Sequence, residues 1–310
     1  MNDAHCHFFS PHFFAALARQ RQRNESADDL CRELAWDPPI SAEALGDRWV
    51  RELDANGVTR AAMIASVAGD EDSVAVAVAR HPSRLVGFFM VDPAAAEAVH
   101  RTRRAVTELG MRTVCLFPAM HHVRLTDERL MRVVDAAIAE QPDTVVFVHC
   151  GELTVGVRSR LGLPSRFDLQ LGDPLAVASL AGTFRNTAFI IPHFGAGRLR
   201  DALMAADACH NIYLDTSSSN AWTKYTPNLT LRDVFKTALD VVGPERLLFG
   251  TDSSFFPRGW NRDIADAQTL ILSELGVSDA DRALIFGGNF DRLFPSSRLL
   301  NHESRIKNQQ

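Results

Sequence analysis

The sequence lacks the features that mark several specialised classes of protein. Its 310 residues carry a net charge of −5, so there is no basic excess of the kind that binds nucleic acids or anionic membranes. No apolar run is long enough to span a bilayer. No charged-then-apolar segment precedes the first histidines, so we expect no signal peptide. The expectation is a cytoplasmic protein without nucleic-acid or membrane partners.

Paired cysteines and glycine-rich phosphate loops are also missing. The five cysteines are scattered, without Cys-x-x-Cys spacing, which predicts reduced packing residues. No Gly-x-Gly-x-x-Gly loop follows the first apolar segment, which argues against a doubly wound dinucleotide-binding sheet. Since the chain has no internal repeat, low-complexity tract or linker, we interpret residues 1–300 as a single domain and 301–310 as a polar tail.

Short apolar runs alternate regularly with helical patterns along the chain. Eight runs have the composition of strands, at 4–8, 61–66, 85–91, 113–118, 145–151, 188–195, 212–218 and 247–254. Helical patterns lie between them, including 102–110, 126–141, 230–243 and 265–276. Because strands that alternate with helices run parallel, we predict an α/β fold, a (β/α)8 TIM barrel distorted by a long insertion after the first strand. An open doubly wound sheet is the competing architecture.

Polar side chains stand at the carboxyl ends of four of these apolar strands. His5 and His7 lie one residue apart on the first strand, so in an extended chain they point to the same face. His149 ends the fifth strand, His193 the sixth and Asp252 the eighth. The chemistry of such barrels takes place at these strand ends, and a buried cluster of polar groups is costly unless something pairs with it. We therefore predict a metal centre here.

The ordered set HCH, VHCG, PHFG and GTD, closed by IFGGNFDRLF, resembles the amidohydrolase superfamily. In particular it is similar to the amidohydrolase-2 branch, which includes amino-carboxymuconate-semialdehyde decarboxylase. The resemblance implies metal ligands at His5, His7, His149 and Asp252, and a catalytic role for His193. The fourth strand, TVCLFPAM, has no lysine or glutamate to bridge two metals. The resemblance therefore implies one divalent ion, with zinc as the first choice and manganese as the second.

A metal held in this way changes the chemistry of water. It lowers the pKa of a bound water from about 15.7 toward about 7, which makes hydroxide available. We expect Asp252 to take the proton of that water, and His193 to stabilise the oxyanion or protonate the leaving group. The expected function is mononuclear metal-dependent hydrolysis of a small cyclic or carboxylated compound. A non-oxidative decarboxylase of an aromatic or dienoic acid is the alternative, and a barrel that binds without turnover is a third possibility.

Loops after the last two strands indicate the nature of the substrate. Trp222 follows the seventh strand, and Arg258 and Trp260 follow the eighth. Aromatic walls and a guanidinium suit a small planar carboxylic acid. An inter-loop salt bridge for Arg258 and ordinary packing for the tryptophans are the alternatives. The identity of the acid and a homo-oligomeric state stay open.

Two long connections and one pair of histidines border the predicted site. The connections span residues 9–60 and 152–174, and connections of this length are usually lids or functional insertions. His121 and His122 follow the fourth strand. They are interpreted as exposed loop histidines, with contact of one of them to substrate as the alternative.

Overall fold

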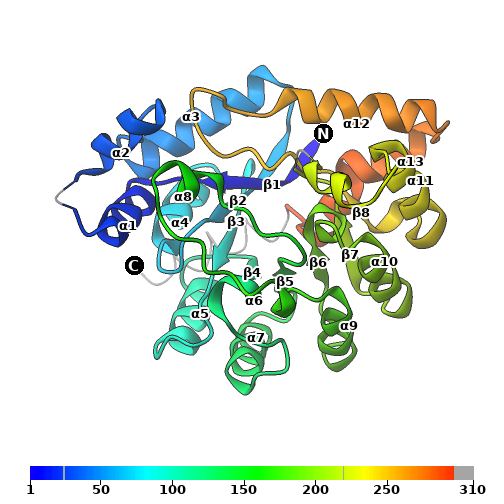
Figure 1. Ribbon diagram of the computed structural model, residues 1–310, viewed down its shortest axis with the longest axis horizontal. Helices are drawn as coiled ribbons and strands as arrows, with labels where there is room; N and C mark the ends of the chain where they lie inside the picture. The colour runs from blue at the N-terminus through cyan, green and yellow to red at the C-terminus, as the bar shows by residue number, and fades with distance from the viewer. Residues whose placement is uncertain (24, 219, 297–310) are drawn as a thin grey trace.

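The computed structural model describes residues 1–23, 25–218 and 220–296, so the tail predicted at 301–310 lies outside the described residues. Eight parallel strands pair with one another in chain order and form the predicted (β/α)8 TIM barrel (Figure 1). Each predicted strand is present: β1 Asn2–Phe8, β2 Arg60–Ala65, β3 Leu85–Met90, β4 Thr113–Leu116, β5 Val145–Val148, β6 Phe189–Ile191, β7 Ile212–Asp215 and β8 Leu247–Leu248.

Backbone hydrogen bonds between β1 and the segment after β8 close the barrel. The Asp252 N–H donates to the His5 carbonyl at 2.9 Å, and the His7 N–H donates to the Ser253 carbonyl at 2.7 Å. β8 itself spans only two residues, so closure depends on these bonds. Because they join the segments that carry three of the predicted ligands, closing the barrel also fixes the distance between those ligands.

Helices surround the barrel and fill its connections. They are α1 Pro11–Arg21, α2 Ala27–Leu34, α3 Ala42–Ala55, α4 Glu71–Arg80, α5 Ala98–Thr107, α6 Pro118–His121, α7 Glu128–Glu140, α8 Gly156–Arg160, α9 Pro174–Thr183, α10 Leu199–Ala208, α11 Leu231–Val242, α12 Arg262–Glu274, α13 Asp279–Ala283 and α14 Asn289–Leu293. The helix predicted at 126–141 is α7, and Asp127 caps its N-terminus, because the Asp127 carboxylate accepts the Arg129 N–H. No helix in the described part of the chain is long and apolar enough to cross a membrane.

Side chains alternate between the inside of the barrel and the layer under the helices. On β5, for example, Phe147 packs inside the barrel, whereas Val146 and Val148 pack against the helices. The next position that points inward beyond Phe147 is His149. This period of two is why polar groups at the strand ends project into the barrel mouth while Cys150 faces the helix layer.

The two long connections pack against each other over the carboxyl ends of the strands. The insertion between β1 and β2 contains α1, α2 and α3, and the connection after β5 contains α8. Apolar side chains of both connections form one buried cluster, which includes Phe13 of α1, Leu34 of α2 and Val157 of α8. α8 accordingly lies beside α1 and α2 in Figure 1. The predicted insertion is therefore a folded cover for the barrel mouth.

Candidate metal centre

Three ligand atoms from β1 and the loop after β8 converge at the barrel mouth. The Nε2 atoms of His5 and His7 lie 3.4 Å apart. The Asp252 Oδ1 atom lies 3.1 Å from Nε2 of His7 and 3.6 Å from Nε2 of His5. Ligand atoms of a tetrahedral zinc ion, with bonds of about 2.0–2.1 Å, stand about 3.3–3.4 Å from one another. The spacing of the three atoms therefore matches one shared divalent ion.

Hydrogen bonds on the far side of each imidazole orient both histidines. The Nδ1 atom of His5 lies 2.7 Å from Oδ2 of Asp215. The Nδ1 atom of His7 lies 2.8 Å from Oγ of Ser66, whose hydroxyl donates to the Ile64 carbonyl and so accepts from His7. With both protons on Nδ1, two Nε2 lone pairs and a carboxylate face one another. A cation relieves that repulsion, and such outer hydrogen bonds are typical of metal-binding histidines.

The charges around the centre favour ionised carboxylates. Burial alone would raise the pKa of Asp215, but its electrostatic attraction to His5 and the hydrogen bond from Nδ1 of His5 lower that pKa overall. Burial likewise opposes ionisation of Asp252, yet the surrounding imidazoles of His7, His5 and His193 hold its pKa well below the usual range. Both groups are therefore carboxylates at neutral pH, which suits a divalent ion.

His149 offers a further imidazole to the same cavity. Its ring stacks on Phe117, with centroids 5.3 Å apart, and it lies outside the compact group formed by His5, His7 and Asp252. Its buried Nδ1 atom has no hydrogen-bond partner, and burial lowers its pKa well below the ordinary value. A buried, unpaired, neutral imidazole nitrogen is costly, and a metal bond would satisfy it. The residues present therefore fit a divalent metal.

His193 is held by hydrogen bonds rather than by the compact ligand group. Its Nδ1 atom lies 2.9 Å from Oγ of Ser217, and the same oxygen lies 3.0 Å from Nδ1 of His5. Since the His5 Nδ1–H is directed at Asp215, the Ser217 hydroxyl donates to His193, which leaves the His193 proton on Nε2. His5, His193 and Asp215 are also close enough together to bind a second metal ion. The hydrogen bonds just described, however, already engage the atoms that would coordinate it.

Tight backbone geometry permits this convergence. A Cβ atom at Gly250 would stand 3.0 Å from the Cβ atoms of both His5 and Ser217, so a larger residue would push these side chains away from their present positions. Asp252 and His193 have φ values of 57° and 56°, in the left-handed region that side chains rarely adopt. Strained residues of this kind cluster at functional sites, where the surrounding structure holds them in place.

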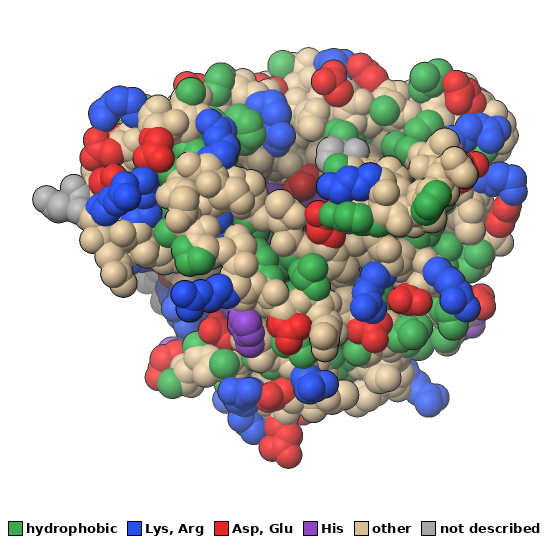
Figure 2. Space-filling model, viewed as in Figure 1, with side chains coloured by type: hydrophobic (Ala, Val, Ile, Leu, Met, Phe, Trp, Pro, Cys, Tyr) green, Lys and Arg blue, Asp and Glu red, His purple; other side chains and the backbone are tan. Residues whose placement is uncertain are grey.

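The polar cluster lies at the bottom of a cavity of about 360 Å³. Arg258 lines this cavity beside Arg160, and its Nη2 atom lies 3.0 Å from Oγ of Ser254. Among the described residues no carboxylate forms a salt bridge with Arg258, so its guanidinium is available to a ligand. Figure 2 shows the corresponding hollow near the centre of this face, with acidic and histidine side chains in its depth.

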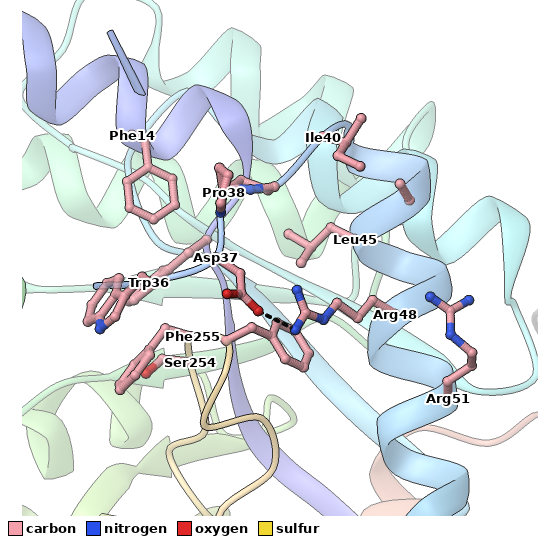
Figure 3. Close-up of a pocket in the computed structure, with 14 residues that line it drawn as sticks. Phe14, Trp36, Asp37, Pro38, Ile40, Leu45, Arg48, Arg51, Ser254 and Phe255 are labelled. Carbon is pink, nitrogen blue, oxygen red and sulfur yellow. Dashed lines mark hydrogen bonds and ion pairs between the residues drawn. The ribbon is translucent and has the colours of Figure 1, made fainter. Parts of the chain in front are cut away.

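The aromatic walls of the cavity differ from the predicted ones. Trp260 is buried, and its indole N–H donates to Asp3 at 2.7 Å, while Trp222 is buried in the main hydrophobic core. Neither lines the cavity. Trp36 of the insertion and Phe255 do so instead, stacked with centroids 4.1 Å apart. On the other side of this stacked pair lies a smaller cavity of about 150 Å³ (Figure 3).

Several supporting residues were missed by the sequence reasoning. Asp215 ends β7 as a charged residue after an apolar strand, which is the same signal that identified Asp252, so the sequence could have revealed it. Ser66, Ser217 and Trp36 carry no such signal, because their roles depend on contacts between segments far apart in the chain.

Comparison with known families and structures gives a consistent result. The family model described as amidohydrolase matches residues 2–295. No protein with a curated description matches the chain significantly by sequence.

Solved structures with low sequence identity share the fold along almost their whole length. A 5-carboxyvanillate decarboxylase from Novosphingobium aromaticivorans, with bound manganese and 3-methoxy-4-hydroxy-5-nitrobenzoic acid, is 14% identical, with a TM-score of 0.61, and the match covers 94% of this chain and 95% of that one. A probable 2-pyrone-4,6-dicarboxylic acid hydrolase from Acinetobacter baumannii, with bound citric acid, is 14% identical, with a TM-score of 0.58 and coverage of 94% and 98%. An amidohydrolase from Burkholderia multivorans with bound zinc is 16% identical, with a TM-score of 0.60 and coverage of 94% and 98%. At these identities the likeness concerns the fold alone.

Proposed function

The chain belongs to the amidohydrolase family, and we propose that within this family it is a mononuclear metal-dependent hydrolase of a small cyclic or carboxylated compound. The single observation that carries the proposal is the convergence of three acceptor atoms of His5, His7 and Asp252 within 3.1–3.6 Å. A binding protein without turnover would have no need of His193 beside them. We further propose that residues 1–300 act as one catalytic domain.

The proposed ligands are His5, His7, His149 and Asp252. Three imidazoles and one carboxylate suit zinc, with manganese as the second choice. When bound, the metal supplies Lewis-acid activation of water and of the substrate carbonyl. Manganese and zinc are also bound in two of the solved structures that share the fold.

Two side chains would handle protons and developing charge. Oδ1 of Asp252 faces the histidines, which leaves Oδ2 to accept a proton from the attacking water. His193 carries its proton on Nε2, because its Nδ1 atom accepts from Ser217. That N–H is suited to donate to the oxygen on which negative charge develops, and loss of one such donor costs roughly 100- to 1,000-fold in rate.

Arg258 is the reason for proposing a negatively charged substrate. It lines the cavity that contains the ligands, and its guanidinium suits a carboxylate held by two parallel hydrogen bonds. A carboxylic acid is also the ligand of the decarboxylase and of the hydrolase described above. Because the same ligands can support carbon protonation and loss of carbon dioxide, the decarboxylase of an aromatic acid is the second candidate, favoured by the fold shared with the 5-carboxyvanillate enzyme.

The proposal is tested by metal analysis combined with a substrate screen. Purified protein should contain close to one equivalent of zinc or manganese, and a chelator should abolish turnover that added metal restores. Lactones, amides and aromatic acids are then screened for water addition and for carbon dioxide release. Water addition supports hydrolysis, and carbon dioxide release alone supports the second candidate. Two metals bound with equal affinity would contradict the mononuclear centre, and turnover that resists complete removal of metal would contradict metal dependence.

A further inference from the structure

A second chamber adjoins the cavity that contains the metal ligands. Its volume is about 610 Å³, larger than the metal-binding cavity. Both are lined by the same six side chains, Phe13, Ser66, Met90, Met120, Val155 and Val157. The question is whether these residues form a wall between two spaces or a ring around one passage.

The six residues come from two sides of the fold. Ser66 follows β2, Met90 ends β3 and Met120 lies in α6 after β4, so these three form a floor along the strand ends. Phe13 and Val157 belong to the buried cluster that joins α1 to α8, and Val155 packs against it. These three form a roof. Because side chains of both the floor and the roof line both cavities, the two cavities meet between them.

Specific contacts hold the roof in place. Arg158 of α8 donates to Oε1 of Gln20 at 2.6 Å, which ties α8 to α1. At the other end of the connection, Nε2 of His122 lies 2.6 Å from the Arg166 carbonyl, and the Asp168 N–H donates to the backbone after β4 at 2.9 Å. The roof is thus fixed on both sides, while the thioether side chains in the floor are flexible and adapt to what passes over them.

The far chamber has a largely apolar lining that also contains charged residues with a positive balance. Arg158, Arg166 and Asp92 line it, so two guanidinium groups face one carboxylate. His121 also lines it, and its buried Nδ1 atom has no hydrogen-bond partner. Burial lowers the pKa of His121, so it is a neutral imidazole that can donate to or accept from a ligand. This chamber therefore suits an anionic or polar group.

We propose that the substrate is an elongated acid, with one end at the metal centre, an apolar middle in the passage and a second acidic group in the far chamber. This inference rests on the proposed function in one respect: it takes the cavity with the metal ligands as the place where the reacting end of the substrate binds. Five of the six shared side chains are apolar, which matches an apolar middle, and Arg166 with His121 matches a distal carboxylate. Covering this passage is then the role of the long insertion after β1.

The test measures binding of rigid acids of increasing length to the zinc-loaded protein by calorimetry. The probes are benzoate, terephthalate, para-biphenyl monocarboxylate and para-biphenyl dicarboxylate. We expect affinity to rise about tenfold or more from benzoate to the biphenyl dicarboxylate, since a further ring is buried and a further charge is paired.

Two variants test which residues cause the increase in affinity with the length of the probe. Met120→Trp fills the passage and should weaken binding of both biphenyl compounds far more than binding of benzoate. The control is Met204→Trp on α10, where Met204 is 48% exposed. Arg166→Gln should remove only the advantage of the dicarboxylate over the monocarboxylate, and its control is Arg132→Gln on α7. Arg166 is at the surface, so this variant remains informative if Met120→Trp fails to fold.

The inference is overturned if affinity does not increase with length, or if Met120→Trp weakens all four probes alike. Because binding is measured without turnover, the proposed reaction can fail independently. A length-dependent affinity with no hydrolysis of any compound would refute only the reaction. Turnover of compact acids without length-dependent binding would refute only the elongated substrate.

Discussion

Replacing Asp215 by asparagine tests how the metal centre is held. The two carboxylate oxygens of Asp215 have separate tasks: Oδ2 accepts from Nδ1 of His5 at 2.7 Å, and Oδ1 accepts the Ser217 N–H at 2.7 Å. An asparagine side chain offers one acceptor and one donor. One of the two N–H groups must therefore face an amide NH2, or His5 must move its proton to Nε2 and lose its metal lone pair.

The size of the effect follows from these contacts. Loss of an outer hydrogen bond to a metal-ligating histidine typically lowers metal affinity 10- to 100-fold, which corresponds to roughly 1.4–2.7 kcal/mol. Asp215 and Ser217 are both fully buried, so water cannot replace the lost partner. We therefore expect the Asp215→Asn variant to bind zinc about 100-fold more weakly, at the upper end of this range.

The assay is competition for zinc between the protein and a chromophoric chelator of known affinity. The control is Asp240→Asn, the same chemical change at a carboxylate that is 63% exposed on α11, which should bind zinc like wild type. Thermal unfolding in chelator shows whether the metal-free variant is folded. A folded Asp215→Asn protein with zinc affinity within about twofold of wild type would refute the reasoning.

The remaining predictions concern other residues at the barrel mouth. The His193→Asn variant should keep its metal content while turnover collapses, whereas His149→Asn should lose metal and activity together; equal loss of metal from both, measured by elemental analysis, would make His193 a ligand. The Arg258→Lys variant should bind a carboxylated inhibitor roughly tenfold more weakly, because an ammonium group cannot reproduce the two parallel hydrogen bonds, while its binding of the matching neutral amide should be unchanged. Equal weakening of both compounds, measured by calorimetry, would make Arg258 a structural residue.

The candidate site could be predicted from the sequence only in part. His5, His7 and Asp252 were recognisable because each is a polar residue at the end of an apolar strand, and such ends meet at one face of a barrel. Trp222 and Trp260 were predicted to contact the substrate, but neither lines the cavity. A position in a loop after a barrel strand does not determine where the side chain points. Trp260 turns back to donate to buried Asp3, and the aromatic wall comes from Trp36, more than two hundred residues away in the chain.

The sequence by itself determined the strands, their parallel order and the positions of the candidate ligands, since a period of two and helical periodicity are local properties that survive in any part of the chain. Only the tertiary structure decided what surrounds those ligands. The hydrogen bond from His5 to Asp215 and the buried cluster between α1 and α8 each join segments that the chain brings together only when the barrel closes. Such contacts depend on the register between distant elements, and no local pattern specifies that register.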